Sequence, residues 1–132
     1  MVLDGKPLLD WLMAPTRIYV KNLLALLEQV EVHSLCHVTG GGLPENVARA
    51  LGPKCDGVID TEQWEPPPIF AFLQRHGVTR DEMFRVFNMG IGYVLAVRPT
   101  SVKRVYGVLE EQGALPLVIG QVKRGRGRVV LR

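Results

Sequence analysis

The chain has 132 residues, of which 47% are apolar and 22% charged, and its formal net charge is +3. This length and composition predict one globular core and exclude intrinsic disorder. No apolar run reaches the roughly 20 residues that span a bilayer, and the first residues lack the pattern of a secretory signal. We therefore expect a cytoplasmic protein that has no membrane partner.

The start of the chain has no regular pattern. Gly5 and Pro7 interrupt it, and a further proline follows at Pro15. We therefore expect residues 1–14 to be a connecting segment and residues 15–132 to form the folded domain.

Apolar residues at helical or alternating spacing divide the rest of the chain into elements. Thr16 is predicted to cap the first helix, and a capping box starting at Thr79 begins a later one. The all-apolar run 91–97 predicts a central strand covered on both faces. The order predicts an α+β domain with a mixed sheet covered by helices. The expected elements are helix 16–30, strand 32–38, helix 44–51, strand 57–60, a helix from 69 ending before Gly77, a helix from 79 to about 87, strand 91–97, helix 101–112, and a hairpin of strands 118–122 and 129–131.

A strand that runs into three glycines and then into a helix is the first candidate for ligand binding. His37 lies in this strand, and Gly40, Gly41 and Gly42 precede the helix. Glycines let a ligand approach the backbone, and the free amides and dipole of a helix N-terminus favour phosphate. Thr39 adds a hydroxyl donor, and His37 adds a donor or a proton. An ordinary tight turn is the alternative.

Two further segments offer polar groups to a ligand. Gly90 and Gly92 flank the entry to the 91–97 strand, where glycine indicates a close approach of backbone or ligand, and Asn88 offers both a donor and an acceptor. The alternative is a helix that ends at Asn88, with Gly90 in a turn. Arg17 either pairs with a phosphate or lies on the exposed face of a helix.

The cysteines and the main basic run do not define a separate site. Cys36 and Cys55 each lie in an apolar stretch, so buried free thiols are expected. The histidine and cysteine spacing does not match a zinc pattern. The run Lys123–Arg128 is predicted to form the solvated turn of the last hairpin. A nucleic-acid-binding patch is the alternative interpretation of this run.

Nucleotide-binding and metal-binding patterns are absent from the sequence. It has no Walker loop, dinucleotide fingerprint or nucleophile elbow. It also has no pair of close carboxylates suited to a divalent metal, so we assign no metal ligand to this chain.

Three segments carry a family resemblance, in order and at matching spacing: Pro15–Lys21, His37–Asn46 and Phe87–Gly92. On these segments the chain resembles the C-terminal domain of aminoimidazole ribonucleotide synthetase, also called phosphoribosylformylglycinamidine cyclo-ligase. Trp64 with Pro67–Phe70 also fits this family, as does Val118–Gly120. The resemblance extends from about Leu9 to Leu131.

The resemblance implies a three-layer α/β/α domain with partial similarity to a ferredoxin-like fold. It also implies that this is the second of two domains. The N-terminal domain would carry the glycine-rich ATP loop, the acidic residues near Mg²⁺ and much of the homodimer contact. This chain alone is therefore expected to be inactive and to have its own N-terminal domain as a partner.

For the full-length protein, the resemblance implies ATP-dependent closure of the imidazole ring of formylglycinamidine ribonucleotide in de novo purine biosynthesis. ATP phosphorylates the formyl amide oxygen, the amidine nitrogen attacks the activated carbon, and phosphate leaves. His37 and Asn88 are the expected catalytic residues. The residues expected to bind substrate or phosphate at the inter-domain cleft are Arg17, Thr39, Gly40, Gly41, Gly42, Glu45, Asn46 and Gly90.

Two alternatives to this function stay open. Thiamine-monophosphate kinase, selenophosphate synthetase and the larger purine amidotransferase share the domain type. A phosphate-binding or regulatory module without catalysis is the second alternative, because this chain lacks the ATP-binding patterns.

Overall fold

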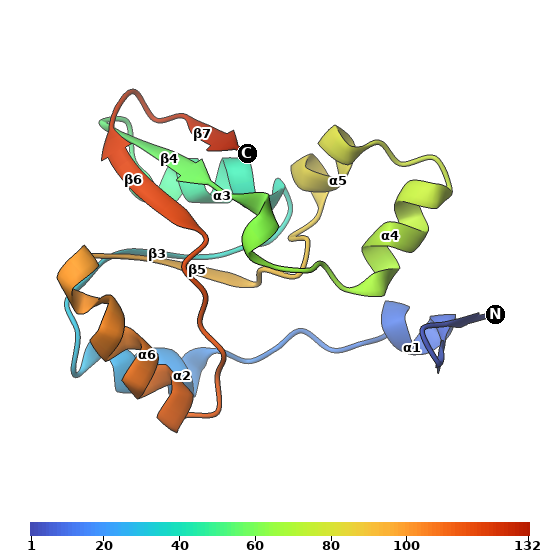
Figure 1. The fold of residues 1–132 in the computed structure, drawn as a ribbon, viewed down its shortest axis with the longest axis horizontal. Coiled ribbons are helices and arrows are strands. Elements are labelled where there is room, and N and C mark those ends of the chain that lie inside the picture. The colour runs from blue at the N-terminus through green and yellow to red at the C-terminus, as the bar shows by residue number, and fades with distance from the viewer.

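The computed structural model describes residues 1–132 (Figure 1). Two short 3₁₀ helices, Thr61–Gln63 and Pro99–Ser101, accompany the main elements. The main elements, in chain order, are β1 (Val2–Leu3), β2 (Lys6–Pro7), α1 (Leu8–Leu12), α2 (Val20–Leu27), β3 (Val32–His37), α3 (Gly42–Leu51), β4 (Cys55–Ile59), α4 (Pro68–Arg75), α5 (Arg80–Val86), β5 (Tyr93–Val97), α6 (Val102–Glu111), β6 (Gly120–Arg124) and β7 (Val129–Leu131).

Helices lie on both sides of the antiparallel pair β3–β5, which crosses the middle of the molecule (Figure 1). On one side, α2 and α6 pack together around the buried side chains of Leu26 and Val108. On the other side lie α3, α5 and the sheet β6–β4–β7 (Figure 1). That sheet is mixed, because β6 is antiparallel and β7 parallel to β4. The predicted α+β class is confirmed.

The apolar side chains of β5 serve two cores. Leu95 and Val97 pack with the α2–α6 core, whereas Val94 packs with the core on the other side. This division follows from the alternation of side chains along a strand. However, β5 has a single partner strand, and all five of its residues are only partly buried. The predicted central position in a sheet was therefore wrong. An all-apolar run indicates that apolar groups cover both faces of a strand, but it does not indicate how many strands lie beside it.

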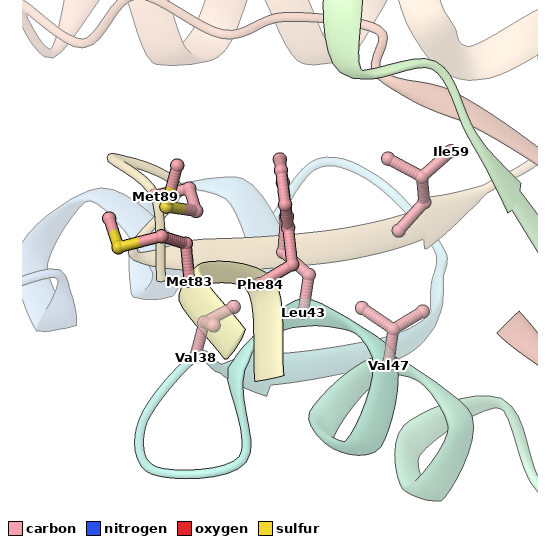
Figure 2. Packing of buried hydrophobic residues seen from close by; sticks show 7 residues of the cluster. All are labelled: Val38, Leu43, Val47, Ile59, Met83, Phe84 and Met89. Carbon is pink, nitrogen blue, oxygen red and sulfur yellow. The ribbon is translucent and has the colours of Figure 1, made fainter. Parts of the chain in front are cut away.

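The larger core fixes α3 and the loop that precedes it. Leu43 and Val47 are four residues apart, so they share one face of α3, and they point towards Phe84 and Ile59 (Figure 2). Full burial of a side chain of this size stabilises the fold by about 1.5–3 kcal/mol. The buried members of this core are Val38, Leu43, Val47, Ile59, Met83, Phe84 and Met89.

The C-terminal strands do not form the predicted hairpin. Both β6 and β7 pair with β4, which lies between them. The connecting loop crosses the start of β4, where the amide of Gly125 donates to the carbonyl of Lys54 and that of Gly127 to the carbonyl of Cys55. The hairpin was wrong because two strands joined by a short glycine-containing loop look alike whether or not a third strand lies between them.

Asp56 in β4 holds this basic loop in place. Its Oδ1 accepts hydrogen bonds from the backbone amides of Arg126 and Arg128, each at 2.8 Å. These two amides, with that of Arg128 the larger cause, lower the pKa of the Asp56 carboxyl. The basic side chains of the loop are exposed, as the predicted solvated turn requires, although the loop crosses a strand.

We expect Asp56→Ala to lower the melting temperature at pH 7, because two loop amides lose their acceptor. The folded-state pKa lies below the ordinary 3.8, so this stabilisation is present above that value and is lost as the pH falls through the folded pKa. The difference in melting temperature from the wild type should therefore shrink as the pH is lowered below 3.8. Asp56→Asn, which keeps an oxygen acceptor, serves as the uncharged control. A difference that stays constant to the lowest pH would contradict this account.

The first residues are regular and not irregular as expected. β1 and β2 form a two-stranded hairpin around Asp4 and Gly5, which have φ angles of 49° and 72°. The positive angles at both positions are those of a type I′ turn. The indole of Trp11 in α1 donates to the carbonyl of Leu3 at 2.9 Å and lies under the ammonium of Lys6. The expected lack of regular structure was therefore wrong for residues 2–12.

The first long helix starts four residues later than predicted. α2 begins at Val20, and its preceding residue is Tyr19, not Thr16. The segment from Thr16 to Tyr19 is not helical, and it places the ring of Tyr19 against His37 at the end of β3. Thr16 was therefore wrong as the cap, and the predicted position of Arg17 on a helix face was wrong with it.

The predicted cap of α5 is confirmed. The hydroxyl of Thr79 accepts from the backbone amide of Glu82.

Cys36 and Cys55 are free as predicted, but they are partly and not fully buried. Partial burial raises the pKa of the Cys36 thiol. None of the helices is long and apolar enough to cross a bilayer.

Candidate functional site

The Gly-rich loop, Thr39–Gly42, connects the end of β3 to the start of α3 and bulges away from the larger core (Figure 2). Gly41 and Gly42 have φ angles of 95° and 62°, in the left-handed region that favours glycine. The amide of Gly42 donates to the carbonyl of Thr39, which closes the turn. Thr39 and Gly40 are exposed to solvent, so a ligand is able to reach this loop.

Asn46 holds the loop from inside. It is fully buried, and its Nδ2 donates to the carbonyls of Thr39, Gly40 and Gly42 at 3.3, 3.1 and 2.8 Å. Its Oδ1 accepts from the guanidinium of Arg49 at 2.7 Å. Both ends of its side-chain amide therefore bond to the loop or to α3, and because Asn46 is fully buried it organises the loop from inside.

The position of Asn46 decides where the loop amides point. In a peptide unit the N–H is directed opposite to the C=O. Because the carbonyls of Thr39, Gly40 and Gly42 turn inwards to Asn46, the amides of Gly40, Gly41 and Leu43 turn away from it. These three amides have no acceptor within the chain. They lie at the N-terminus of α3, where the helix dipole also favours an anion.

The three glycines of the loop differ in what an added side chain would meet. Around Gly40 there is open space, so its lack of a side chain leaves the outer face of the loop clear. A Cβ on Gly41 would overlap the carboxylate of Glu45, which folds back over the helix start. A Cβ on Gly42 would overlap the backbone carbonyl of Phe84 in α5. Gly42 is thus required by packing, and Gly40 is the one that leaves room for a ligand.

The segment around Asn88 forms a tight turn that contains Gly90, which was the alternative interpretation of its sequence. The Oδ1 of Asn88 accepts from the amide of Gly90 at 2.9 Å, and its carbonyl accepts from Ile91. Gly90 has a φ of 94°, and a Cβ there would lie 2.6 Å from Cδ of Pro67. The Nδ2 of Asn88 has no partner within the chain, so this atom is able to donate to a ligand.

The indole of Trp64 fixes this turn by donating to the carbonyl of Met89 at 2.9 Å. The turn and the Gly-rich loop belong to segments in direct contact. Val38 donates its amide to the carbonyl of Gly92 at 2.9 Å, and Gly42 packs against the end of α5. Two of the segments that the sequence singled out therefore pack against each other.

An aromatic cluster brings in the third segment. The rings of Tyr19, His37 and Tyr93 lie with centroids 5.2–5.8 Å apart, and His37 and Tyr93 are opposite each other on β3 and β5. The guanidinium of Arg17 lies 5.9 Å from the centre of the Tyr19 ring. Arg17 and His37 thus both border the Tyr19 ring, whereas the two tyrosines were missed as site residues. The signal for Tyr93 was the alternation that places it on one face with Leu95, and this face was interpreted as core.

A mostly apolar cavity with a volume of about 670 Å³ lies between β5, α6 and β4. Arg17, Tyr19 and Gly90 line it, whereas the Gly-rich loop does not. Of the expected site residues, two therefore face this mostly apolar cavity and the rest lie outside it. The loop is an exposed surface site and not the wall of a closed pocket.

Acidic, histidine and cysteine side chains do not gather into a metal site. No three of them lie close enough together to hold an ion.

Comparison with known proteins identifies the family of this chain. Residues 2–132 match the family described as AIR synthase related protein, C-terminal domain. A protein of Bacillus velezensis named phosphoribosylformylglycinamidine cyclo-ligase is 49% identical over 124 residues, which are 93% of this chain and 36% of that protein. The chain thus spans about a third of the length of this relative. The chain belongs to the family of C-terminal domains of AIR synthase related proteins.

Proposed function

We propose that this chain is the phosphate-holding C-terminal part of a phosphoribosylformylglycinamidine cyclo-ligase in de novo purine biosynthesis. The observation that carries the proposal is the pair of free amides of Gly40 and Gly41 just before α3, which unlike that of the fully buried Leu43 are open to a ligand. The family and the relative from Bacillus velezensis support the choice of reaction. The substrate, formylglycinamidine ribonucleotide, carries a phosphate of the kind that such amides bind.

The proposal includes the rest of the protein. Residues 1–14 lead from an N-terminal domain, and residues 15–132 form the C-terminal domain. The N-terminal domain binds ATP with Mg²⁺ and forms most of a cytoplasmic homodimer. This assignment accounts for the lack of a metal-ligand cluster in this chain. ATP supplies the phosphoryl group that activates the formyl oxygen.

In this proposal the chain acts by positioning. The loop amides hold the phosphate of the substrate, and the exposed hydroxyl of Thr39 adds a donor. The free Nδ2 of Asn88 donates to the formyl oxygen or the amidine end of the substrate. His37 supplies a ring nitrogen that holds or moves a proton, and Arg17 attracts the anionic ligand.

Glu45 has a role different from the expected one. Its carboxylate folds over Gly41, at the place where an anion would bind the helix start. The Glu45 carboxylate would repel a phosphate bound beside it, because both groups are negatively charged. In our proposal the phosphate therefore binds on the Gly40 side of the loop, or it displaces the Glu45 side chain.

A chimera tests the proposed function. This chain would replace the matching 36% of the Bacillus velezensis cyclo-ligase, and ATP-dependent ring closure would be measured. We expect an active enzyme, with Gly40→Val lowering kcat/KM at least about 100-fold, because the side chain fills the approach to the amides. Gly107→Val, at a glycine in α6 that likewise has open space around it and no positive φ, is the matched control. A soluble chimera that unfolds cooperatively but closes no ring would contradict the proposal.

A further inference from the structure

Tyr19 belongs to the aromatic cluster, and the proposed reaction gives it no role. It precedes α2, and its ring meets the imidazole of His37 edge-on, with centroids 5.7 Å apart. It also lies 5.2 Å from the ring of Tyr93. His37 itself is exposed and ends β3, so few other groups limit its rotation. Its surroundings are therefore mainly the two tyrosine rings.

Gly92 fits this arrangement. A Cβ on Gly92 would overlap the hydroxyl of Tyr19 and lie 2.8 Å from its Cζ. The φ angle of Gly92 is not positive, so its backbone does not lie in the left-handed region. The glycine is therefore explained by the space that the Tyr19 ring needs and not by the backbone angle.

A third contact involves the Tyr19 ring. The guanidinium of Arg17 lies 5.9 Å from the ring centre, within the range of a cation–π interaction. The ring thus contacts Gly92 and Arg17, and it in turn borders His37. The arrangement therefore depends on ring packing and on one cation–π contact.

We propose that Tyr19 is a positioning residue: its ring, seated on Gly92, fixes the imidazole of His37 beside the Gly-rich loop. The role of His37 in ring closure rests on the proposed function, whereas the coupling of Tyr19, Gly92 and His37 does not. Without the ring, an exposed imidazole at a strand end populates several rotamers. A reactive group that is displaced in this way loses effective concentration at the substrate.

Nuclear magnetic resonance of this chain tests the coupling without any reaction. The Hδ2 and Hε1 resonances of His37 should move when Tyr19→Leu removes the ring current, and should stay nearly unchanged in Tyr19→Phe. Gly92→Ala should move them as well, because the new methyl group pushes the ring away. In the Gly92→Ala background, Tyr19→Leu should add little further change. Unchanged His37 resonances in both Tyr19→Leu and Gly92→Ala would overturn the proposal.

Kinetics of the chimera separate a positioning role from a purely structural one. We expect Tyr19→Leu to lower kcat by about 10- to 100-fold with little change in KM, and Tyr19→Phe to retain most of the rate. Ile18→Ala, at an exposed neighbour, is the control and should match the wild type. An equal loss in Tyr19→Phe, or no loss in Tyr19→Leu, would overturn the positioning role. If the wild-type chimera is inactive, the proposed function fails, and the resonance shifts still decide the coupling.

Discussion

Gly42→Ala is expected to destabilise the domain by about 3 kcal/mol or more. The left-handed backbone at this position, with φ of 62°, costs a non-glycine residue about 1 kcal/mol or more. The added methyl group would also overlap the backbone carbonyl of Phe84, which belongs to a helix and is unable to rotate away. Overpacking of this kind costs about 1–3 kcal/mol. Urea unfolding followed by circular dichroism measures the loss.

Gly40→Ala is the matched control for this variant. Gly40 has open space around it and no positive φ, so alanine should change the free energy of unfolding by less than about 0.5 kcal/mol. Equal stability of the two variants would mean that α3 and α5 do not pack as closely at Gly42 as the structure shows.

Asn46→Leu is expected to cost about 2–3 kcal/mol, because a side chain of similar size leaves inward-facing carbonyls without donors. Its Nδ2 serves the carbonyls of Thr39, Gly40 and Gly42, and the last of these bonds is buried. The variant should also let the loop carbonyls turn outwards, which would remove the free amides from the loop surface. Thermal and urea unfolding measure the first effect, and amide resonances of the loop measure the second.

Asn22→Leu provides the comparison for Asn46→Leu. Asn22 lies in α2, is partly buried and makes no side-chain hydrogen bond within the chain. We expect its replacement to change the free energy of unfolding by less than about 0.5 kcal/mol. If the two variants were equally stable, the three bonds of Asn46 would contribute nothing to the loop.

Much of the fold follows from local signals in the sequence. The Thr79 capping box predicted the start of α5, because a hydroxyl three residues before an amide fixes a helix start locally. Asp4–Gly5 is likewise a local signal for a two-residue hairpin, although the prolines around it led to the prediction of an irregular segment. The late start of α2 was not predictable locally, because the Tyr19 ring is placed by Gly92 in a distant strand.

Pairing between distant segments was the part that could not be predicted. The insertion of β4 between β6 and β7 depends on amides of the basic loop reaching Lys54, Cys55 and Asp56. The glycine spacing near the C-terminus is equally compatible with a hairpin. Only the partner strand decides between them.

The candidate site was predicted in part. The three segments around Arg17, His37 and Asn88 do meet. The roles within them differ, because a sequence shows residue types but not which of their atoms are already bonded. Asn46 has its polar atoms occupied by the loop and Arg49, and Gly42 is a packing residue.

The central claim is that the free amides of the Gly-rich loop bind the phosphate of the substrate. Titration of the ¹⁵N-labelled chain with formylglycinamidine ribonucleotide, and separately with inorganic phosphate, tests it directly. We expect saturable shifts of the amides of Gly40 and Gly41, with none at the open Gly77, and loss of these shifts in Gly40→Val. Shifts elsewhere in the chain with none in the loop, or shifts that persist in Gly40→Val, would contradict the account.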